Sequence, residues 1–286
     1  MTLRVGTRGS ALARVQTAIV TDRIPVASET VVIRTSGDAT DRPIPELGDG
    51  AFVTAIEEAL RRGEIDVAVH SLKDLPTGDR PGLVLAAILE REDPRDVLVT
   101  RARGGLATLP RGASVGTSSP RRDAFLRALR PDIASRPIRG NVDTRLRKVR
   151  DGEYDATVLA LAGLRRLGVE VGDVEILDPM DIPPAPGQGA LTVQCRADDE
   201  GTIRILSALD HGPTRRAVEA EREVLRLLGA SCEIPLGAWG RVEDDVVVLD
   251  AALPTGDSVA RAHARGRDPL GVAREVADAL GGRVVA

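Results

Sequence analysis

The chain has 286 residues, of which 42% are hydrophobic and 29% charged, and its formal net charge at pH 7 is -4. This size and composition fit a globular protein of two or three domains and exclude a disordered chain. The acidic balance and an aromatic content of 1% argue against a nucleic-acid-binding protein, which would need basic surfaces and rings for base stacking.

The N-terminal part of the chain alternates predicted strands and helices. It begins a strand at once and has no apolar signal region, and no stretch approaches the roughly 18 apolar residues of a membrane span, so we expect a cytoplasmic protein. The expected elements are a strand at 3–7, a helix at 10–23, a strand at 29–36, a helix at about 51–62 and a strand at 65–69. A loop at 37–50, rich in Asp, Pro and Gly, interrupts the series. Such alternation predicts a parallel sheet.

The segment H-S-L-K-D-L-P, residues 70–76, follows the apolar strand at 65–69 directly. It places Lys73 beside Asp74 where the strand should end, and ligands of open α/β sheets bind at the carboxyl ends of strands. Lys73 is also one of only two lysines in the chain. The pair is therefore a candidate for chemistry. The alternative is a surface ion pair at the start of a loop.

A second series of strands and helices follows a polar crossing segment around 90–96. Its expected elements are strands at 96–100, 113–116, 133–138 and 155–161 and helices at 120–129, 142–150 and 162–167. The proline-rich and glycine-rich segment 183–189 is the clearest break, and the strand at 190–195 is expected to return to the first sheet. This pattern predicts two lobes joined by two crossings.

From about residue 212 the pattern changes to that of an α+β domain. The expected elements are a helix at 213–228, strands at 234–241, 246–253 and 258–265, and a last helix at 269–280. We predict domain 1 at 1–92 and 189–209, domain 2 at 93–188 and domain 3 at 210–286.

Three predicted strand-to-helix turns, at 7–10, 116–122 and 138–145, carry arginines beside helix N-cap candidates, which are Ser10, Ser119 and Asn141. A cation at a helix N-terminus is unfavourable by about 0.3–1 kcal/mol when exposed. The arrangement makes sense if an anion binds there, because free N–H groups and guanidinium groups would all face it. Converging turns would form a cleft for a ligand with many carboxylates or phosphates. The alternative is that arginine is simply the default cation of this chain.

The two cysteines differ in their expected surroundings. Cys232 lies in the turn at 228–237, where a loop thiol can become a nucleophile, although spacing alone favours an inert thiol. Cys195 lies on an apolar strand and is expected in the core. No H-E-x-x-H, P-loop or G-x-G-x-x-G pattern occurs, so no metal or nucleotide site is predicted.

Seven segments in a fixed order resemble the porphobilinogen deaminase family, also called the hydroxymethylbilane synthases. They are H-S-L-K-D-L-P, E-R-E-D-P-R-D, V-G-T-S-S-P-R-R, I-R-G-N-V-D-T-R-L, L-A-L-A-G-L-R-R-L-G, P-G-Q-G-A and G-A-S-C-E-I-P-L-G. Each motif alone is weak, but the ordered set is highly specific. Beyond Gly237 the chain matches only in pattern.

The resemblance implies a fold and a reaction. The expected fold is α/β, with two periplasmic-binding-protein-like lobes of mixed, mainly parallel sheets and a smaller α+β C-terminal domain. The expected activity is that of a transferase of porphyrin and heme biosynthesis. It would join four porphobilinogen molecules, with loss of ammonia, into the linear tetrapyrrole hydroxymethylbilane on a covalent dipyrromethane primer. A monomer is expected, with no nucleic-acid or membrane partner and with its product passed to a following cyclising enzyme.

The resemblance also assigns roles to residues. It carries the thioether to dipyrromethane onto Cys232 and the catalytic carboxylate onto Asp74. Cofactor binding is expected of Lys73, Ser119, Arg121, Arg122, Arg139 and Arg145. Substrate binding is expected of Arg8, Ser10, Arg139, Arg145 and Arg166. Gln188 matches a position in the hinge region. The loop at 45–52 lacks the two lysines of many family members, and Phe52 is kept only as a candidate lid residue.

Two other classes of protein are alternatives to this family. A two-lobed small-anion-binding protein, or the effector domain of a regulator, would use the arginine turns without chemistry, but neither gives a reason for Cys232 or for a third domain. An RNA-binding protein is disfavoured by the acidic balance and the scarcity of aromatic residues.

Overall fold

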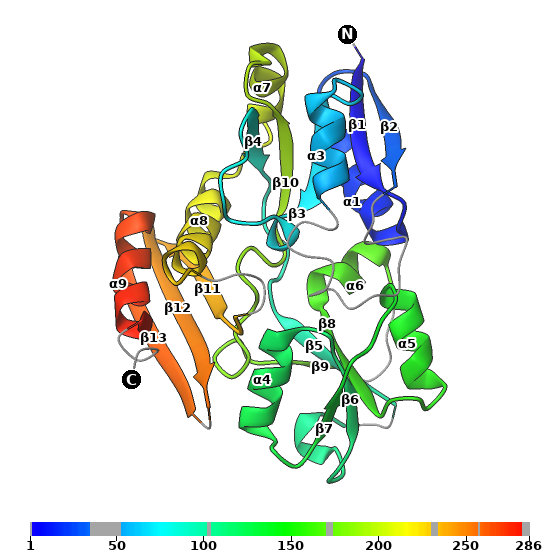
Figure 1. Cartoon of the computed structure of the whole chain (residues 1–286), viewed down its shortest axis with the longest axis vertical. Coiled ribbons are helices and arrows are strands. Elements are labelled where there is room, and N and C mark those ends of the chain that lie inside the picture. The colour runs from blue at the N-terminus through cyan, green and yellow to red at the C-terminus, as the bar shows by residue number, and fades with distance from the viewer. Residues whose placement is uncertain are drawn as a thin grey trace. The chain divides into compact units, whose positions relative to one another are not determined.

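The computed structural model describes residues 2–34, 53–101, 104–169, 174–229, 234–256 and 258–281. The expectations for Phe52, Cys232 and the loop at 37–50 lie outside these residues. The chain divides into two compact units, Met1–Glu92 with Ala190–Arg216 and Asp93–Gly189 with Ala217–Ala286. Figure 1 labels the elements of both units.

Unit 1 is built on a five-stranded sheet of order β2-β1-β3-β10-β4. Its strands are β1 (Leu3–Arg8), β2 (Ser28–Ile33), β3 (Val67–Ser71), β4 (Leu83–Ile88) and β10 (Leu191–Arg196). Its helices are α1 (Ala11–Thr21), α3 (Thr54–Arg61) and α7 (Glu200–Ser207). β10 pairs antiparallel with both β3 and β4, so it is the one reversed strand in the sheet. The predicted return of this strand to the first sheet is confirmed.

Alternating side chains of this sheet are buried on both faces, as the period of two along a strand requires. Val67, Val69 and Val193 pack on one face with Val20 of α1 and Leu206 of α7. Ala68 packs on the opposite face with Ile56, Ala59 and Leu60 of α3. Burial on both faces explains why the central strands are continuous apolar runs.

The larger sheet of unit 2 has the order β7-β6-β8-β5-β9. Its strands are β5 (Asp96–Thr100), β6 (Ser114–Gly116), β7 (Ala134–Arg136), β8 (Ala156–Ala160) and β9 (Val174–Ile176), and its helices are α4 (Pro120–Leu129), α5 (Val142–Arg150) and α6 (Leu161–Leu167). β5 is antiparallel to both of its neighbours, β8 and β9. The predicted mixed, mainly parallel sheets are therefore confirmed. In each sheet the reversed strand is the first one after the chain crosses between the units.

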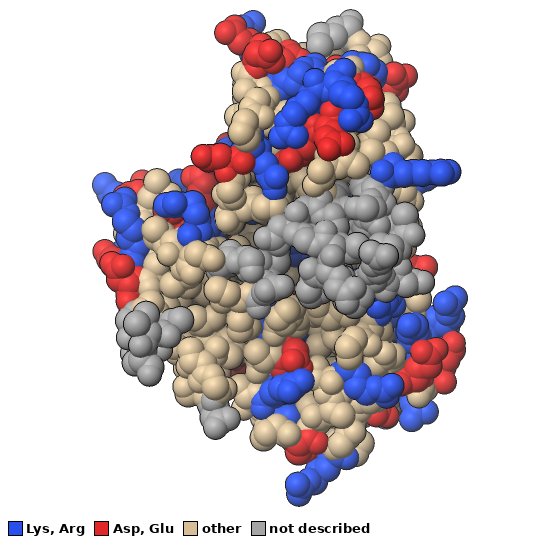
Figure 2. All heavy atoms as spheres, in the orientation of Figure 1, with Lys and Arg blue, Asp and Glu red and all other residues tan. Residues whose placement is uncertain are grey.

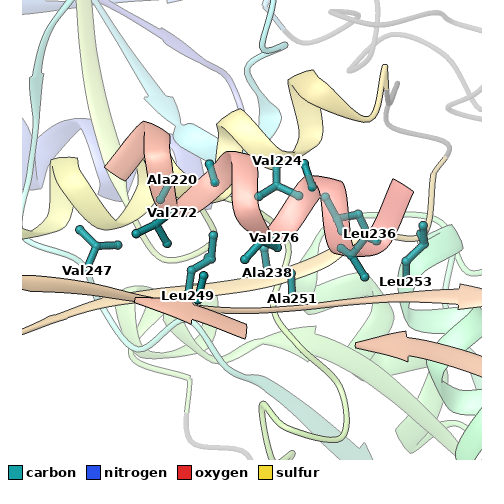
Figure 3. Packing of buried hydrophobic residues seen from close by; sticks show 14 of the residues in the cluster. Ala220, Val224, Leu236, Ala238, Val247, Leu249, Ala251, Leu253, Val272 and Val276 are labelled. Carbon is teal, nitrogen blue, oxygen red and sulfur yellow. The ribbon is translucent and has the colours of Figure 1, made fainter. Parts of the chain in front are cut away.

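The C-terminal part of unit 2 is a three-stranded antiparallel sheet covered by two helices. It consists of α8 (Gly212–Leu227), which begins in unit 1, β11 (Gly237–Glu243), β12 (Val246–Thr255), β13 (Ser258–Gly266) and α9 (Pro269–Gly281). Val224 of α8 and Val272 and Val276 of α9 pack over Leu249 and Ala251 of β12 (Figure 3). This confirms the predicted α+β character of the C-terminal part.

The described surface carries charges of both signs side by side. On the face drawn in Figure 2, acidic and basic side chains are interspersed rather than gathered into one basic region. Several of them form exposed pairs, such as Arg62 with Glu64 and Arg226 with Glu223. None of the described helices is long and apolar enough to cross a bilayer.

Candidate functional site

A short turn at the end of β3 presents Asp74 at the surface. A single 3-10 turn, Leu72–Asp74, follows the strand. Leu72, the first residue of the turn, and Leu75, just after it, are both buried, and the Leu72 N–H donates to the Ala190 carbonyl oxygen at 3.0 Å. The two leucines anchor the turn to the core, which leaves the Asp74 carboxylate exposed.

Asp74 lines a pocket together with Arg8, Ser10 and His70. Lys73, half-buried on the same turn, does not line this pocket. The structure therefore brings three predicted site residues of unit 1 around one hollow. Their roles stay predictions.

The first arginine turn has the predicted helix cap. Ser10 is the N-cap of α1, its Oγ accepts the Ala13 N–H at 3.3 Å, and the first turn of the helix contains no acid. Gln16 Nε2 donates to Ser71 Oγ at 2.9 Å and so joins α1 to the end of β3. The positive end of this helix and Arg8 thus lie at the same pocket as Asp74.

His70 is a functional candidate that the sequence analysis noted only as part of a motif. Its side chain is 6% exposed. Burial lowers the pKa of His70 to about 4; the charges of Arg8 and Arg80 act in the same direction and Gln194 opposes them. The imidazole in the pocket is therefore neutral near pH 7. Its place beside Lys73 and Asp74 was visible in the sequence, but its burial was not.

The second arginine turn begins α4 with the predicted cap. Ser119 is the N-cap, with Pro120 in the first helical position, and its Oγ accepts the Arg122 N–H at 3.4 Å. Arg121 and Arg122 follow inside the helix and are only 5% and 7% exposed. Two adjacent arginines are therefore buried at the start of one helix.

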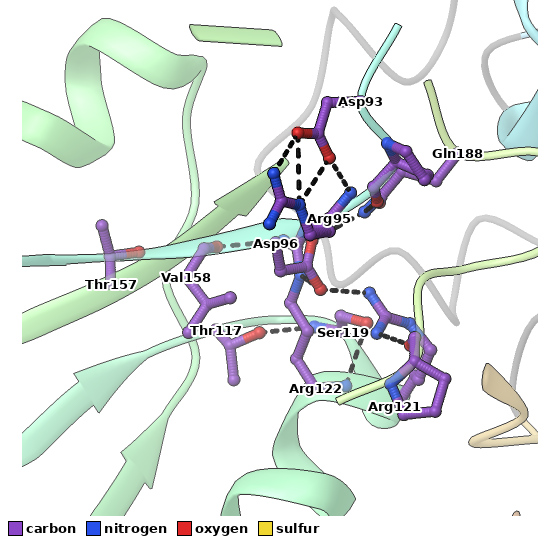
Figure 4. Close-up of polar contacts among 12 residues, drawn as sticks. Asp93, Arg95, Asp96, Thr117, Ser119, Arg121, Arg122, Thr157, Val158 and Gln188 are labelled. Carbon is purple, nitrogen blue, oxygen red and sulfur yellow. Dashed lines mark hydrogen bonds and ion pairs between the residues drawn. The ribbon is translucent and has the colours of Figure 1, made fainter. Parts of the chain in front are cut away.

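Both arginines pair with Asp96, a residue that the sequence analysis did not assign to the site. Arg121 Nη2 lies 2.6 Å from Asp96 Oδ2, and Arg122 Nη2 lies 2.8 Å from Oδ1 (Figure 4). Arg122 Nη1 also donates to the Val158 carbonyl oxygen at 2.9 Å, and Arg121 Nη1 donates to that of Pro183. Cofactor binding by these two arginines stays a prediction, since most of their donors have partners inside the unit.

The charge balance around Asp96 follows from this geometry. Burial acts to raise the pKa of Asp96, but the charges and hydrogen bonds of Arg121 and Arg122 outweigh it and hold that pKa well below its usual range. Burial also lowers the pKa of Arg121, and Asp96 opposes that shift. The carboxylate is thus ionised at neutral pH.

The third arginine turn contributes two further guanidinium groups. Asn141 occupies the N-cap position of α5 as predicted, but its side chain makes no capping hydrogen bond. Burial lowers the pKa of Arg145 to about 10, and the charges of Arg122 and Arg139 act in the same direction. Within the described part of the chain, no carboxylate pairs with Arg139 or Arg145. Like charges from the second and third turns therefore act on one another, while the convergence of the first turn with them stays a prediction.

Arg166 and Gln188 lie against the segments that cross between the units. Arg166 Nη2 donates to the Gly189 carbonyl oxygen at 2.6 Å. Gln188, 1% exposed, donates from Nε2 to the Pro94 carbonyl oxygen at 2.6 Å and to Asp96 Oδ1 at 2.8 Å. The predicted hinge residue is therefore part of the same polar network as the buried arginines (Figure 4).

Cys195 is not a candidate nucleophile. Cys195 is fully buried on β10, and burial raises the pKa of its thiol to about 11. The expectation that it is a core residue is confirmed. Among the described residues, no group of three or more His, Cys, Asp or Glu side chains could hold a metal ion.

Comparisons with known proteins cover nearly the whole chain. The family profile "Porphobilinogen deaminase, dipyromethane cofactor binding domain" matches residues 3–204, and "Porphobilinogen deaminase, C-terminal domain" matches residues 215–284. A relative from Roseiflexus sp. (strain RS-1), named "Porphobilinogen deaminase", is 48% identical over 297 residues, covering 99% of this chain and 98% of that protein. Relatives of the same name from Acidothermus cellulolyticus and Thermobifida fusca are 50% and 51% identical, covering 91% and 89% of this chain and 82% of each relative.

Solved structures resemble this chain more distantly. The Bordetella pertussis BvgS periplasmic VFT2 domain is 16% identical, covers 72% of this chain and 85% of its own, and has a TM-score of 0.42. An ancestral cationic amino acid solute binding protein is 14% identical, covers 73% of this chain and 87% of its own, and has a TM-score of 0.43.

Proposed function

The chain belongs to the porphobilinogen deaminase family, and from that membership we propose that it joins four porphobilinogen molecules into hydroxymethylbilane with loss of ammonia. The single structural observation that supports this most is that Arg139 and Arg145 have no carboxylate partner among the described residues, while the charges of Arg122 and Arg139 lower the pKa of Arg145. Guanidinium groups gathered in this way favour a ligand with several carboxylates.

Dipyrromethane fits this donor set. Each of its two pyrrole rings carries an acetate and a propionate, so the group is a polyanion. A charge-assisted hydrogen bond contributes about 1.5–3 kcal/mol, and ligand carboxylates would also offset the mutual repulsion of the arginines. We propose that Arg139 and Arg145 hold its carboxylates, that Arg121, Arg122 and Ser119 complete the site, and that Cys232, outside the described residues, bears the thioether. When bound, the group supplies the electron-rich pyrrole to which the first substrate unit is joined.

Asp74 is the proposed catalytic carboxylate. Loss of ammonia breaks the substrate's C–N bond, the electron pair leaves on nitrogen, and positive charge spreads over the pyrrole ring. A carboxylate that accepts the pyrrole N–H stabilises this charge as it develops and can carry a proton between steps. The exposed position of Asp74 at a pocket supports this role.

The remaining substrate contacts are proposed on the same grounds. Arg8 and the capped N-terminus of α1 line the Asp74 pocket, and both favour a bound carboxylate. Lys73 and Arg166 are proposed as further carboxylate contacts, the first to the cofactor and the second to the substrate. Gln188 is proposed as a hinge residue, and Phe52 as a lid residue.

The proposed setting of the enzyme is what its family membership implies. We propose a cytoplasmic monomer. Its product carries a reactive hydroxymethyl group at one end of an open chain, and we propose that a following enzyme takes up this product and closes the ring.

One experiment tests the function. The purified protein is incubated with porphobilinogen. The ammonia and hydroxymethylbilane that form are quantified, and the intact mass of the protein is measured before and after the incubation. We expect turnover and a covalent mass increment of two pyrrole units. Asp74→Asn should keep the fold and the increment but lose at least about 100-fold in kcat, as is usual for a catalytic acid or base. Asp79→Asn, an exposed aspartate a few residues further along, should match the wild type. A bare polypeptide mass in fully active protein would contradict the proposal.

A further inference from the structure

Asp96 accepts hydrogen bonds from three side chains that come from two distant parts of the sequence. It opens β5, directly after the first crossing between the units, and is 0% exposed. Oδ1 accepts from Arg122 Nη2 at 2.8 Å and from Gln188 Nε2 at 2.8 Å, while Oδ2 accepts from Arg121 Nη2 at 2.6 Å and from Arg122 Nε at 3.2 Å. Figure 4 shows the three donors around one carboxylate.

The same network includes both crossing segments. Gln188 precedes the second crossing, and its Nε2 also donates to the carbonyl oxygen of Pro94, just after the first crossing, at 2.6 Å. Arg121 Nη1 donates to the Pro183 carbonyl oxygen, and Glu221 Oε2 accepts the Gly187 N–H at 2.7 Å. The two crossings are therefore joined to each other, and to the start of α4, by hydrogen bonds within unit 2.

The charges around Asp96 indicate that this residue does more than stabilise the fold. A buried ion pair contributes little net stability compared with an apolar replacement of the same volume. Asp96 also leaves an excess of positive charge nearby, since it pairs with Arg121 and Arg122 while Arg139 and Arg145 have no carboxylate partner among the described residues. The carboxylate thus fixes the geometry of the site without removing its attraction for an anion.

We propose that Asp96 is a positioning residue for elongation, which holds the buried arginines and the two crossings in one shared arrangement. It acts through Arg121, Arg122 and Gln188, and no contact between Asp96 and a ligand is required. The proposal rests on the proposed function, because its consequences are read as cofactor loading and turnover.

The test compares Asp96→Asn with two controls. Leu98→Ala, also on β5, removes a fully buried side chain of the core and so lowers stability without touching the network. Asp93→Asn removes a nearby carboxylate whose partners are Arg95 and Arg165. For each protein we would measure the urea unfolding curve, the fraction carrying the two-pyrrole adduct by intact mass, and kcat and KM per folded molecule.

If Asp96 is a positioning residue, Asp96→Asn should carry less of the two-pyrrole adduct. Its kcat per folded molecule should fall about 10- to 100-fold, the range expected when reacting groups are misplaced. Leu98→Ala, similarly destabilised, and Asp93→Asn should keep wild-type values per folded molecule. Wild-type loading and kcat in Asp96→Asn, or an equal loss in Leu98→Ala, would overturn the proposal.

A second variant decides the matter if Asp96→Asn does not fold. Gln188→Met removes the link between the crossings but leaves both arginines on Asp96, so no buried charge loses its partner. We expect normal adduct loading with a reduced kcat, and wild-type kcat would overturn the proposal. Failure of the proposed function is separate, because it would appear as absent turnover in the wild-type protein itself.

Discussion

His70 shows how burial sets the chemistry of a residue beside the candidate catalytic carboxylate. An exposed histidine titrates near pH 6.5, but the imidazole in the Asp74 pocket has a pKa of about 4. It is therefore neutral where the enzyme is expected to work, and the charges of the pocket come from Asp74 and Arg8. A protonated ring there would repel the positive charge that develops on the substrate.

This shift predicts a pH dependence of stability. Between about pH 6.5 and pH 4 the unfolded chain binds a proton at residue 70 that the folded chain does not, so the free energy of unfolding falls as the pH falls through this window. The full effect is at most about 3 kcal/mol for a shift of this size. Urea unfolding at pH 7 and pH 5 should show a smaller drop for His70→Gln than for the wild type. Equal drops would contradict a neutral, buried ring.

Arg139 allows binding to be separated from stability. It has no carboxylate partner among the described residues and lies close enough to Arg145 to perturb its pKa. Arg139→Gln should therefore change the free energy of unfolding by no more than about 0.5 kcal/mol. Loss of one charge-assisted bond should nevertheless weaken cofactor loading or raise KM about tenfold or more.

The matched control for Arg139 is Arg147→Gln, an exposed arginine on α5. It removes the same charge from the same region of the chain and should leave loading and KM at wild-type values. Equal effects of the two substitutions would mean that net charge, and not the arginine cluster, attracts the ligand.

Single-residue predictions from sequence succeeded where the signal was local. The turn chemistry of Ser10 and Ser119 placed two helix caps correctly, because a capping hydroxyl and the backbone N–H that donates to it are separated by only three residues. The partner of Arg121 and Arg122 was missed, since Asp96 is 25 and 26 residues away along the chain. The position of Asp96 at the start of an apolar strand does not predict the ion pairs that it forms in the folded protein.

At the scale of elements, periodicity located most α-helices and strands of the described residues and missed three of them. β5 at 96–100, α4 at 120–129 and α5 at 142–150 agree with their predicted bounds. β4 (Leu83–Ile88), β9 (Val174–Ile176) and α7 (Glu200–Ser207) were not predicted. β4 is an apolar run without alternation, β9 has three residues, and α7 has only two turns, so each gives little periodic signal.

The missed helix α7 has a cap that can be tested. Asp199 Oδ1 accepts the Thr202 N–H at 3.0 Å, and Oδ2 accepts the Thr202 hydroxyl at 2.8 Å. Asp199→Ala should lower the free energy of unfolding by about 1–2 kcal/mol in a urea titration, because the helix N-terminus loses its acceptor. Asp198→Ala, one residue earlier and exposed, is the control and should change it little. If the cap does not stabilise the helix, both variants should give the same urea unfolding curve.

At the scale of the whole molecule, we expect a bound ligand and added salt both to reduce the repulsion among the guanidinium groups. Cys232→Ser, which cannot form the thioether, should melt at a lower temperature than the loaded protein because a ligand bound only by the folded state stabilises it. Added salt screens like charges, so it should raise the Tm of the variant more than that of the loaded protein. Identical salt responses in scanning calorimetry would show that the arginines do not repel one another in the unloaded state.

The broad plan of the molecule was predictable because it rests on the order of strands and helices. Alternating elements, a break at 183–189 and a change of pattern near 212 were enough to predict two lobes and an α+β C-terminal part. The positions of β5 and β10 within their sheets were not, because pairing between strands about 60 to 120 residues apart leaves no local signature.

The place of β10 has a consequence for how the nascent chain acquires its structure. β10 lies between β3 and β4, and its side chains Leu191, Val193 and Cys195 belong to the core of that sheet. A ribosome that has released only the first 92 residues has therefore made a sheet with a gap where this strand belongs, and β4 has no neighbour on that side. The N-terminal third of the polypeptide therefore cannot complete its sheet until about a hundred further residues have been synthesised.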